Sequence, residues 1–176
     1  MIDSFFKDKR VSITGGAGFI GSAIARRLAN LCEVTIVDSL TPEFGGNLKN
    51  LEEVKSLVKI KIADIRDKTT VEDLVKNTDI IFNMAGQTSH MDSMKEPFID
   101  LEINTHAQLS ILEAMRIHNS KAKIIFASTR QVYGRPNYLP ADENHPISPV
   151  DVNSINKHAG EQYHILYNDV YGIRTS

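Results

Sequence analysis

The hydrophobic pattern of the chain begins as a strand, a glycine-rich turn and a helix. Residues 10–14 (RVSIT) are a short β-branched run, and the apolar positions within 20–31 recur at helical spacing. Residues 33–38 (EVTIVD) predict a second strand. In 57–64 (LVKIKIAD), apolar residues alternate with lysines. This alternation predicts a third strand with one face in water, as at the edge of a sheet.

Two further runs predict strands that are covered on both faces. Residues 78–86 (TDIIFNMAG) and 122–129 (AKIIFAST) are continuous apolar runs bounded by small and polar residues. Helices are expected at 104–118 and 151–171, the second ended by Gly172. Strands alternating with helices predict an α/β fold with a doubly wound parallel sheet, the Rossmann fold. Because the pattern stops after the helix that follows strand five, we expect a truncated form.

The composition is that of one globular domain over residues 1–176. Twenty basic and 22 acidic residues give a formal charge of -2, which offers no reason to expect nucleic-acid binding. No apolar run approaches the roughly 18 residues of a membrane span, and the first residues lack the apolar core of a secretory signal. We therefore expect a cytoplasmic protein without membrane contact or metal site. The single cysteine, Cys32, is expected to be a buried, inert thiol.

The segment TGGAGFIG joins the first strand to the first helix. Gly15, Gly18 and Gly21 have a spacing that allows a sharp turn, lets backbone amides approach a pyrophosphate, and packs the helix against the strand. The helix would direct its unpaired N–H groups at the phosphates, so Phe19 and Ile20 are also predicted contacts. The alternative is a tight turn that serves no ligand.

Asp38 ends the second strand, where such folds place an acid that accepts hydrogen bonds from the adenosine ribose hydroxyls. No arginine or lysine lies between 38 and 48, and Glu43 would repel a 2′-phosphate, so NAD is favoured over NADP. Two long loops, 39–47 and 134–150, leave strand ends of the predicted sheet, where sites usually form.

Several motifs occur together in this chain: TGGAGFIG, Asp38, ADIRD (63–67), NMAGQTS (83–89), Asn104 and FASTRQVYG (126–134). Their combination resembles the NAD-dependent epimerase/dehydratase family, the extended short-chain dehydrogenase/reductases that act on nucleotide sugars. The resemblance covers nearly the whole chain. It implies NAD as cofactor and a nucleotide sugar as substrate.

The resemblance also implies roles for residues beyond the glycine turn. Asp64 and Ile65 would flank the adenine, Ala85 and Gly86 would line the cofactor, and Asn104 would order the adjoining helix. Each has a structural alternative: a helix cap for Asp64 or Asn104, and a tight turn for Ala85 and Gly86.

Thr129 stands where the family carries its catalytic serine or threonine, whose hydroxyl bonds the sugar oxygen that changes oxidation state. The alternative is an ordinary strand residue. Arg130 and Gln131 follow it, where the sugar 4,6-dehydratases of the family carry an acid pair for water elimination. Epimerisation or simple redox chemistry is therefore preferred over dehydration.

The family signature Tyr-x-x-x-Lys aligns with NSINK, which places Lys157 on the lysine and Asn153 on the tyrosine. An amide cannot take up a proton near neutral pH, so the family's base is missing. Lys157 would still hold the nicotinamide ribose; its alternative is a surface lysine paired with Glu161. The residues HAGE follow Lys157 as they do in the family, and this resemblance favours the cofactor contact.

The sequence leaves open what replaces the base, with Tyr133, His90 and Tyr138 as candidates. Two functions compete. One is an NAD-dependent nucleotide-sugar epimerase, represented by its dinucleotide-binding domain without the C-terminal substrate-binding part; the other is a non-catalytic NAD-binding module or sensor. The helices 104–118 and 151–171 would form a homodimer contact by the same resemblance. The sugar and its stereocentre are not readable.

Overall fold

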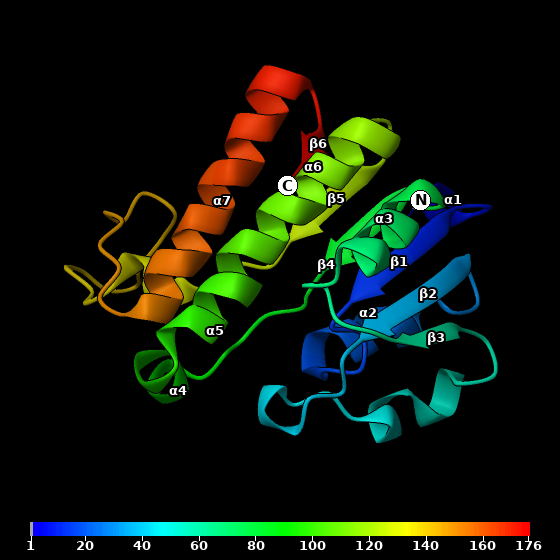
Figure 1. The fold of residues 1–176 in the computed structure, drawn as a ribbon, viewed down its shortest axis with the longest axis horizontal. Coiled ribbons are helices and arrows are strands. Elements are labelled where there is room, and N and C mark those ends of the chain that lie inside the picture. The colour runs from blue at the N-terminus through cyan, green and yellow to red at the C-terminus, as the bar shows by residue number, and fades with distance from the viewer. Residues whose placement is uncertain (1) are drawn as a thin grey trace.

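The fold is a parallel six-stranded sheet covered by helices on both faces (Figure 1). It is seen in a computed structural model that describes residues 2–176. The strands are β1 Arg10–Thr14, β2 Glu33–Asp38, β3 Lys59–Ile62, β4 Ile80–Asn83, β5 Lys123–Phe126 and β6 Arg174–Thr175. The α-helices are α1 Ile2–Phe6, α2 Phe19–Leu28, α3 Lys68–Lys76, α4 His90–Lys95, α5 Pro97–Leu101, α6 Ala107–His118 and α7 Val152–Tyr171. Shorter 3-10 helices are η1 Pro42–Phe44, η2 Leu48–Val54 and η4 Arg130–Tyr133, and a π-helical turn, η3, spans Glu102–His106.

The strand order is β3-β2-β1-β4-β5-β6, and every neighbouring pair is parallel. This order confirms the predicted doubly wound sheet, with β3 at one edge as its alternating pattern indicates. The chain reverses its direction of growth between β1 and β4. In such sheets this switch point opens a crevice at the carboxyl ends of the strands.

Hydrophobic clusters lie on the two faces of the sheet. On one face α3, α6 and α7 are packed side by side (Figure 1). Buried members of that cluster include Val71, Leu74, Ile81, Leu112, Met115 and Ile124. On the other face α2 and η2 pack against the strands. Buried members there include Ile13, Leu28, Ile36, Leu51 and Val54.

The predicted helix 104–118 is wrong at its start. Proline at the first helical position begins α5 at Pro97, and the chain continues through η3 into α6 without leaving helical conformation. Asn104 therefore lies inside the helical segment and is completely buried, so it is not an N-cap.

The last helix was predicted at 151–171 and is found at 152–171. Asp151 is its N-cap, with a capping box in which the Asp151 carboxylate accepts from the Ser154 amide and the Ser154 hydroxyl accepts from the Asp151 amide. Gly172 ends α7 in the left-handed region at φ 66°.

Cys32 lies between α2 and β2 as expected, but it is half-buried and not buried. Burial nevertheless raises the pKa of its thiol. Over residues 2–176, no helix combines the length and the apolar composition that crossing a membrane requires.

Candidate functional site

A cavity of about 360 Å³ lies at the carboxyl ends of β1 to β4, within the usual range for small-molecule sites. Ten of the eleven predicted cofactor contacts line it together: Gly15, Gly18, Phe19, Ile20, Gly21, Asp38, Asp64, Ile65, Ala85 and Gly86. The cavity is also lined by Ser39 and Phe44 of the loop 39–47, which the sequence did not single out individually. The loop 134–150 contributes no lining residue; it packs beside η4, where Ser148 donates to the Val132 carbonyl.

The glycine turn is as tight as its sequence predicts. Gly15 has φ +63°, and a Cβ added to it would lie 2.7 Å from the Ala85 nitrogen. A Cβ on Gly21 would collide with the Gly15 carbonyl oxygen. These contacts hold the turn against β4 and leave the start of α2 facing the cavity.

The N-terminus of α2 is open to an anion. Its N-cap, Gly18, has no side chain to accept a hydrogen bond, and the first turn carries no acidic residue. The first amides of a helix have no partner inside the helix and bear partial positive charge. The residues that line the cavity at this point, Phe19 and Ile20, therefore bring backbone donors to it.

Asp38 also lines the cavity. One carboxylate oxygen accepts from the Ala17 amide and the other from the Leu40 amide, each at 2.9 Å. A carboxylate oxygen has two lone pairs, so each still has capacity for a ribose hydroxyl. A Cβ on Gly46 would lie 2.5 Å from Asp38 Oδ1, which shows how closely the following loop covers the carboxylate.

Asp64 is not a helix cap, because α3 is capped by Asp67. Its carboxylate pairs with the Arg66 guanidinium at 2.7 Å, and this hydrogen bond holds the pKa of Asp64 below its ordinary value. Ile65 is buried against Ile103 at the floor of the cavity.

Lys157 is buried, with 6% of its surface exposed, and donates to the Ala127 carbonyl at 3.0 Å. The predicted alternative of a surface pair is therefore wrong, and Glu161 instead pairs with His158 at 3.1 Å. Burial lowers the pKa of Lys157 to about 8. The lysine does not line the cavity itself, but a Cβ on Gly86, which does, would lie 2.8 Å from its Nζ.

Asn104 lies at the same place. Its amide nitrogen donates to the Gln87 carbonyl at 3.0 Å, whereas its buried oxygen has no partner in residues 2–176. That oxygen would lie 3.0 Å from a Cβ on Gly86. Gly86 thus leaves a space that an ammonium group and an amide oxygen both face.

Asn153 occupies the position of the family's tyrosine, and its side chain is hydrogen-bonded to residues of other elements. Its amide nitrogen donates to the Gln87 carbonyl at 2.8 Å and to Asp100 Oδ2 at 2.9 Å. Asn156 donates to the other oxygen of the completely buried Asp100 at 2.8 Å. This carboxylate was missed from the sequence, because its partners lie more than 50 residues away and an acid on a helix usually faces water.

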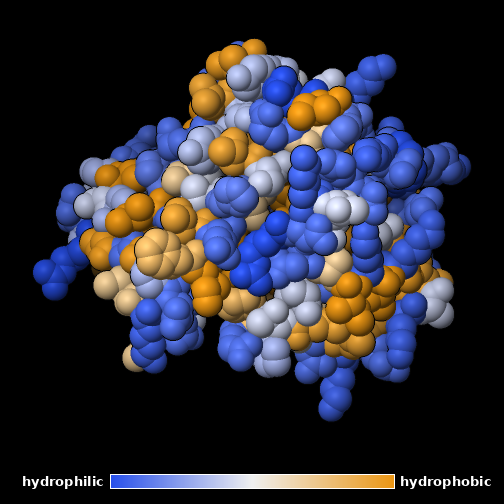
Figure 2. Space-filling view, viewed as in Figure 1, coloured by the Kyte–Doolittle hydropathy of each residue, from blue (hydrophilic) through white to orange (hydrophobic). Residues whose placement is uncertain are grey.

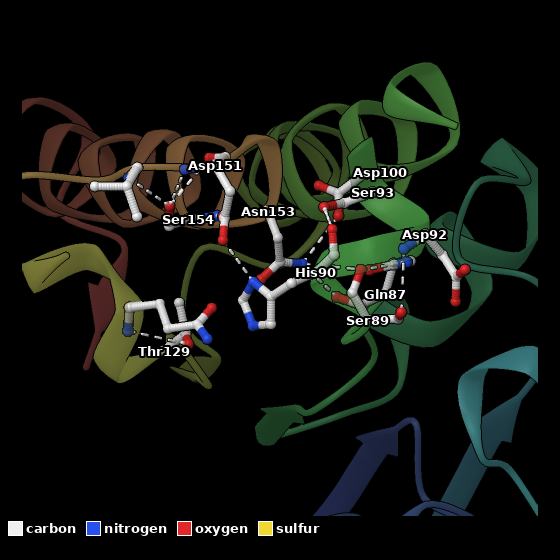
Figure 3. Close-up of polar contacts among 12 residues, drawn as sticks. Gln87, Ser89, His90, Asp92, Ser93, Asp100, Thr129, Asp151, Asn153 and Ser154 are labelled. Atoms are coloured by element: carbon white, nitrogen blue, oxygen red, sulfur yellow. Dashed lines mark hydrogen bonds and ion pairs between the residues drawn. The ribbon is translucent and has the colours of Figure 1, made fainter. Parts of the chain in front are cut away.

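Thr129 is half-buried and caps η4, where its hydroxyl oxygen accepts from the Gln131 amide at 3.3 Å. Figure 3 shows Thr129 and His90 in the same region of the molecule, and neither of them lines the cavity. Of the three candidate bases, Tyr138 donates to Asp142 at 2.8 Å, which raises the pKa of the tyrosine. Tyr133 packs edge-on against His145. His90 pairs through Nδ1 with Asp151 at 2.7 Å.

A doubly wound sheet whose cavity is lined by an open helix N-terminus and by a carboxylate at the end of β2 is typical of the dinucleotide-binding class of Rossmann domain. The family model described as GDP-mannose 4,6 dehydratase matches residues 13–176. A Methanocaldococcus jannaschii protein named "Putative UDP-glucose 4-epimerase" is 43% identical over 166 residues, 93% of this chain and 52% of its own. The chain belongs to the NAD-dependent epimerase/dehydratase family.

Solved structures also resemble the chain, again over about half of their own length. A UDP-N-acetylglucosamine 4-epimerase from Methanobrevibacter ruminantium, in complex with UDP-N-acetylmuramic acid, matches 97% of this chain and 54% of its own at 32% identity and TM-score 0.88. A UDP-glucose 4-epimerase from Thermus thermophilus, in complex with NAD, matches 94% and 53% at 35% identity and TM-score 0.83. The chain spans about half the length of the relatives it matches.

Proposed function

We propose that the chain is the NAD-binding part of a nucleotide-sugar epimerase. The observation that carries this proposal is the juxtaposition of the open N-terminus of α2 with the Asp38 carboxylate in one cavity. The first suits a pyrophosphate and the second a ribose diol. The unpartnered Asn104 oxygen and the space at Gly86 suit a further polar group beside Lys157.

Different residues would hold different parts of NAD. The α2 amides bind the pyrophosphate, Asp38 binds the adenosine ribose, Asp64 and Ile65 flank the adenine, and Lys157 donates to the nicotinamide ribose. Bound NAD supplies a hydride acceptor. The role of Thr129 is to donate a hydrogen bond to the sugar oxygen, since its own oxygen already accepts from Gln131 and its hydrogen remains available.

Epimerisation is preferred over dehydration because of the residues after Thr129. Water elimination needs an acid and a base at the sugar, and Arg130 and Gln131 supply neither at these positions. Redox chemistry at one carbon, with hydride removed and returned, needs no such pair.

A second candidate function is supported by Asn153. The residue at the tyrosine position is an amide, which takes up no proton near neutral pH, and its NH₂ group already donates to Gln87 and Asp100. A domain that binds NAD without turnover would require no base. The two functions differ in whether the bound cofactor is reduced when a sugar is added.

The cofactor assignment is tested with Asp38→Ala. Loss of hydrogen bonds to a charged group costs about 1.5–3 kcal/mol, so the NAD dissociation constant should rise roughly 10-fold to 100-fold. Calorimetric titration of NAD and NADP into the wild type and the variant measures this. Glu52→Ala, an exposed acid on η2, is the control. An unchanged affinity for NAD in Asp38→Ala would remove the assignment.

The chemistry is tested by adding UDP-glucose, dTDP-glucose, CDP-glucose and GDP-mannose, each in turn, to the NAD-loaded complete protein. Absorbance of the reduced nicotinamide after one of these additions supports the epimerase. Tight NAD binding with no reduction by any of them supports the binding module.

A further inference from the structure

Sequence alone left the proton acceptor of the proposed reaction unassigned. We propose that His90, oriented by Asp151, is that acceptor and acts in place of the missing tyrosine. This inference rests on the proposed epimerase function. It is carried by the geometry of one side-chain pair at the start of α7.

The two carboxylate oxygens of Asp151 contact different groups. Oδ1 accepts from the Ser154 amide at 2.7 Å and caps α7, while Oδ2 lies 2.7 Å from His90 Nδ1. Burial alone would raise the pKa of Asp151, but the hydrogen bonds from Ser154 and His90 hold it below its ordinary value. Because an ionised carboxylate only accepts, Nδ1 of the neutral ring carries the hydrogen and Nε2 carries the lone pair.

Nε2 is therefore the basic atom, and it is accessible. The His90 side chain is 34% exposed, and no residue in the range 2–176 bonds to Nε2. Figure 3 places the ring between Asp151 and Thr129, near Asn153. His90 also lies two positions after Thr88, which lines the cavity. His90 on α4 thus brings a basic nitrogen to the start of α7, where the family carries its tyrosine.

Thr129 and His90 offer complementary hydrogen-bonding groups. The Thr129 hydroxyl has a hydrogen to donate to a sugar oxygen, and His90 Nε2 can accept the hydrogen of that same hydroxyl group. His90 Nε2 would take the proton of the sugar hydroxyl group, and the O–H electron pair would become the second carbon–oxygen bond. Bound NAD would supply the acceptor for the hydride that this carbon loses. The protonated His90 would then return its proton to the same oxygen when the hydride is returned to the carbon.

Two substitutions distinguish an effect on the His90 ring from a loss of folding. His90→Gln removes the base and keeps an amide beside Asp151. Asp151→Asn keeps an oxygen for the Ser154 amide, since asparagine is a good N-cap, but presents an NH₂ group to His90. Nδ1 must then accept and Nε2 must carry the hydrogen, so the wrong tautomer results. His158→Gln is the matched control, because His158 is likewise half-buried and paired with a carboxylate, Glu161, at 3.1 Å on α7.

The first measurement needs no cofactor. Long-range ¹H–¹⁵N correlation spectra of this chain, taken about two pH units above the ordinary histidine pKa of ~6.5, report the tautomer of each ring. We expect His90 to carry its hydrogen on Nδ1 in the wild type and on Nε2 in Asp151→Asn. A wild-type His90 protonated on Nε2 would overturn the proposal.

The second measurement is the rate of sugar-dependent cofactor reduction in the complete protein. His90→Gln and Asp151→Asn should each lower it by about 100-fold to 10,000-fold, the usual contribution of a general base, with NAD affinity unchanged. His158→Gln should react as the wild type does. Equal rates in His90→Gln and wild type would refute the role of His90 and leave the proposed epimerase function standing. A wild type that binds NAD yet oxidises none of the four sugars would refute the epimerase function and this role with it.

Discussion

The Lys157 ammonium group donates to one carbonyl, that of Ala127, and lies 5.0 Å from the centre of the Phe126 ring. Water is largely excluded from it, and this loss of hydration is what lowers its pKa to about 8. In the unfolded chain the same group has its ordinary pKa of about 10.4.

This difference predicts how stability depends on pH. Between about pH 8 and pH 10.4 the unfolded chain binds more protons than the folded one, so the free energy of unfolding rises with pH across that window. The contribution of this group amounts to about 3 kcal/mol. Lys157→Met should lack the rise, and urea denaturation at pH 7, 8, 9 and 10 measures it.

The exposed Lys61 provides the control for this experiment. Lys61→Met should keep the wild-type pH profile, because Lys61 is exposed beside Asp73. Parallel profiles for the wild type and Lys157→Met would contradict the expectation.

At this scale the sequence is informative where spacing defines a motif. Gly15, Asp38 and Lys157 could be singled out because a strand, a turn or a helix fixes their neighbours in the sequence. Asp100 could not, because no motif includes it and it meets its partners only through the fold. The role of His90 depends on the same kind of long-range contact, 61 positions apart.

Among the elements, α5 and α7 are joined by the polar contact at Asp100. Two amide groups from α7 donate to a carboxylate that is completely inaccessible to water. Asp100→Ala would leave the Asn153 and Asn156 amides buried with fewer acceptors. A buried donor left without its acceptor costs about 1–3 kcal/mol, so we expect a loss of at least this order in the free energy of unfolding.

Urea denaturation of Asp100→Ala tests this expectation, with Asp73→Ala as control. Asp73 forms an exposed pair with Lys61 at 3.3 Å, and such pairs contribute at most about 1 kcal/mol. Equal stabilities of the two variants would show that the α5–α7 contact contributes little.

The helices also differ in how well the sequence pattern predicts their bounds. The first five strands and α7 lie close to their predicted ranges, because apolar runs and caps mark them locally. The two-residue strand β6 after α7 is not predicted, because it is too short to show a pattern. The start of the segment 97–118 was not predicted correctly, because its first turns leave Phe98, Ile99 and Leu101 partly exposed and so give no amphipathic stripe. Pro97 was the signal that could have placed its start.

For the whole molecule, the predicted order of strands and helices was sufficient to give the sheet, because right-handed crossovers leave few arrangements. The predicted homodimer remains a proposal. Apolar side chains are exposed along α7 (Figure 2). They are Ile155, Ile165, Leu166 and Val170. A second copy of the chain that packed α6 and α7 against them would remove this surface from water.

Leu166→Glu should therefore weaken self-association at least 10-fold, since a charge in an apolar contact costs more than about 1.4 kcal/mol. Sedimentation equilibrium measures the dimer constant. Leu57→Glu is the matched control, because Leu57 and Leu166 are each 48% exposed and Leu57 lies away from α6 and α7. A wild type that is monomeric throughout, or two variants that behave alike, would contradict the dimer.

The buried carboxylate of Asp100 also constrains how this chain could change. A tyrosine at position 153 would restore the family's base but would strip Asp100 of one of its two amide donors and fill the space beside Gln87. The single replacement should therefore unfold the local structure before it improves chemistry. Substitutions at 153 and 100 should therefore be coupled, so that the stability change of the double variant differs from the sum of the two single changes.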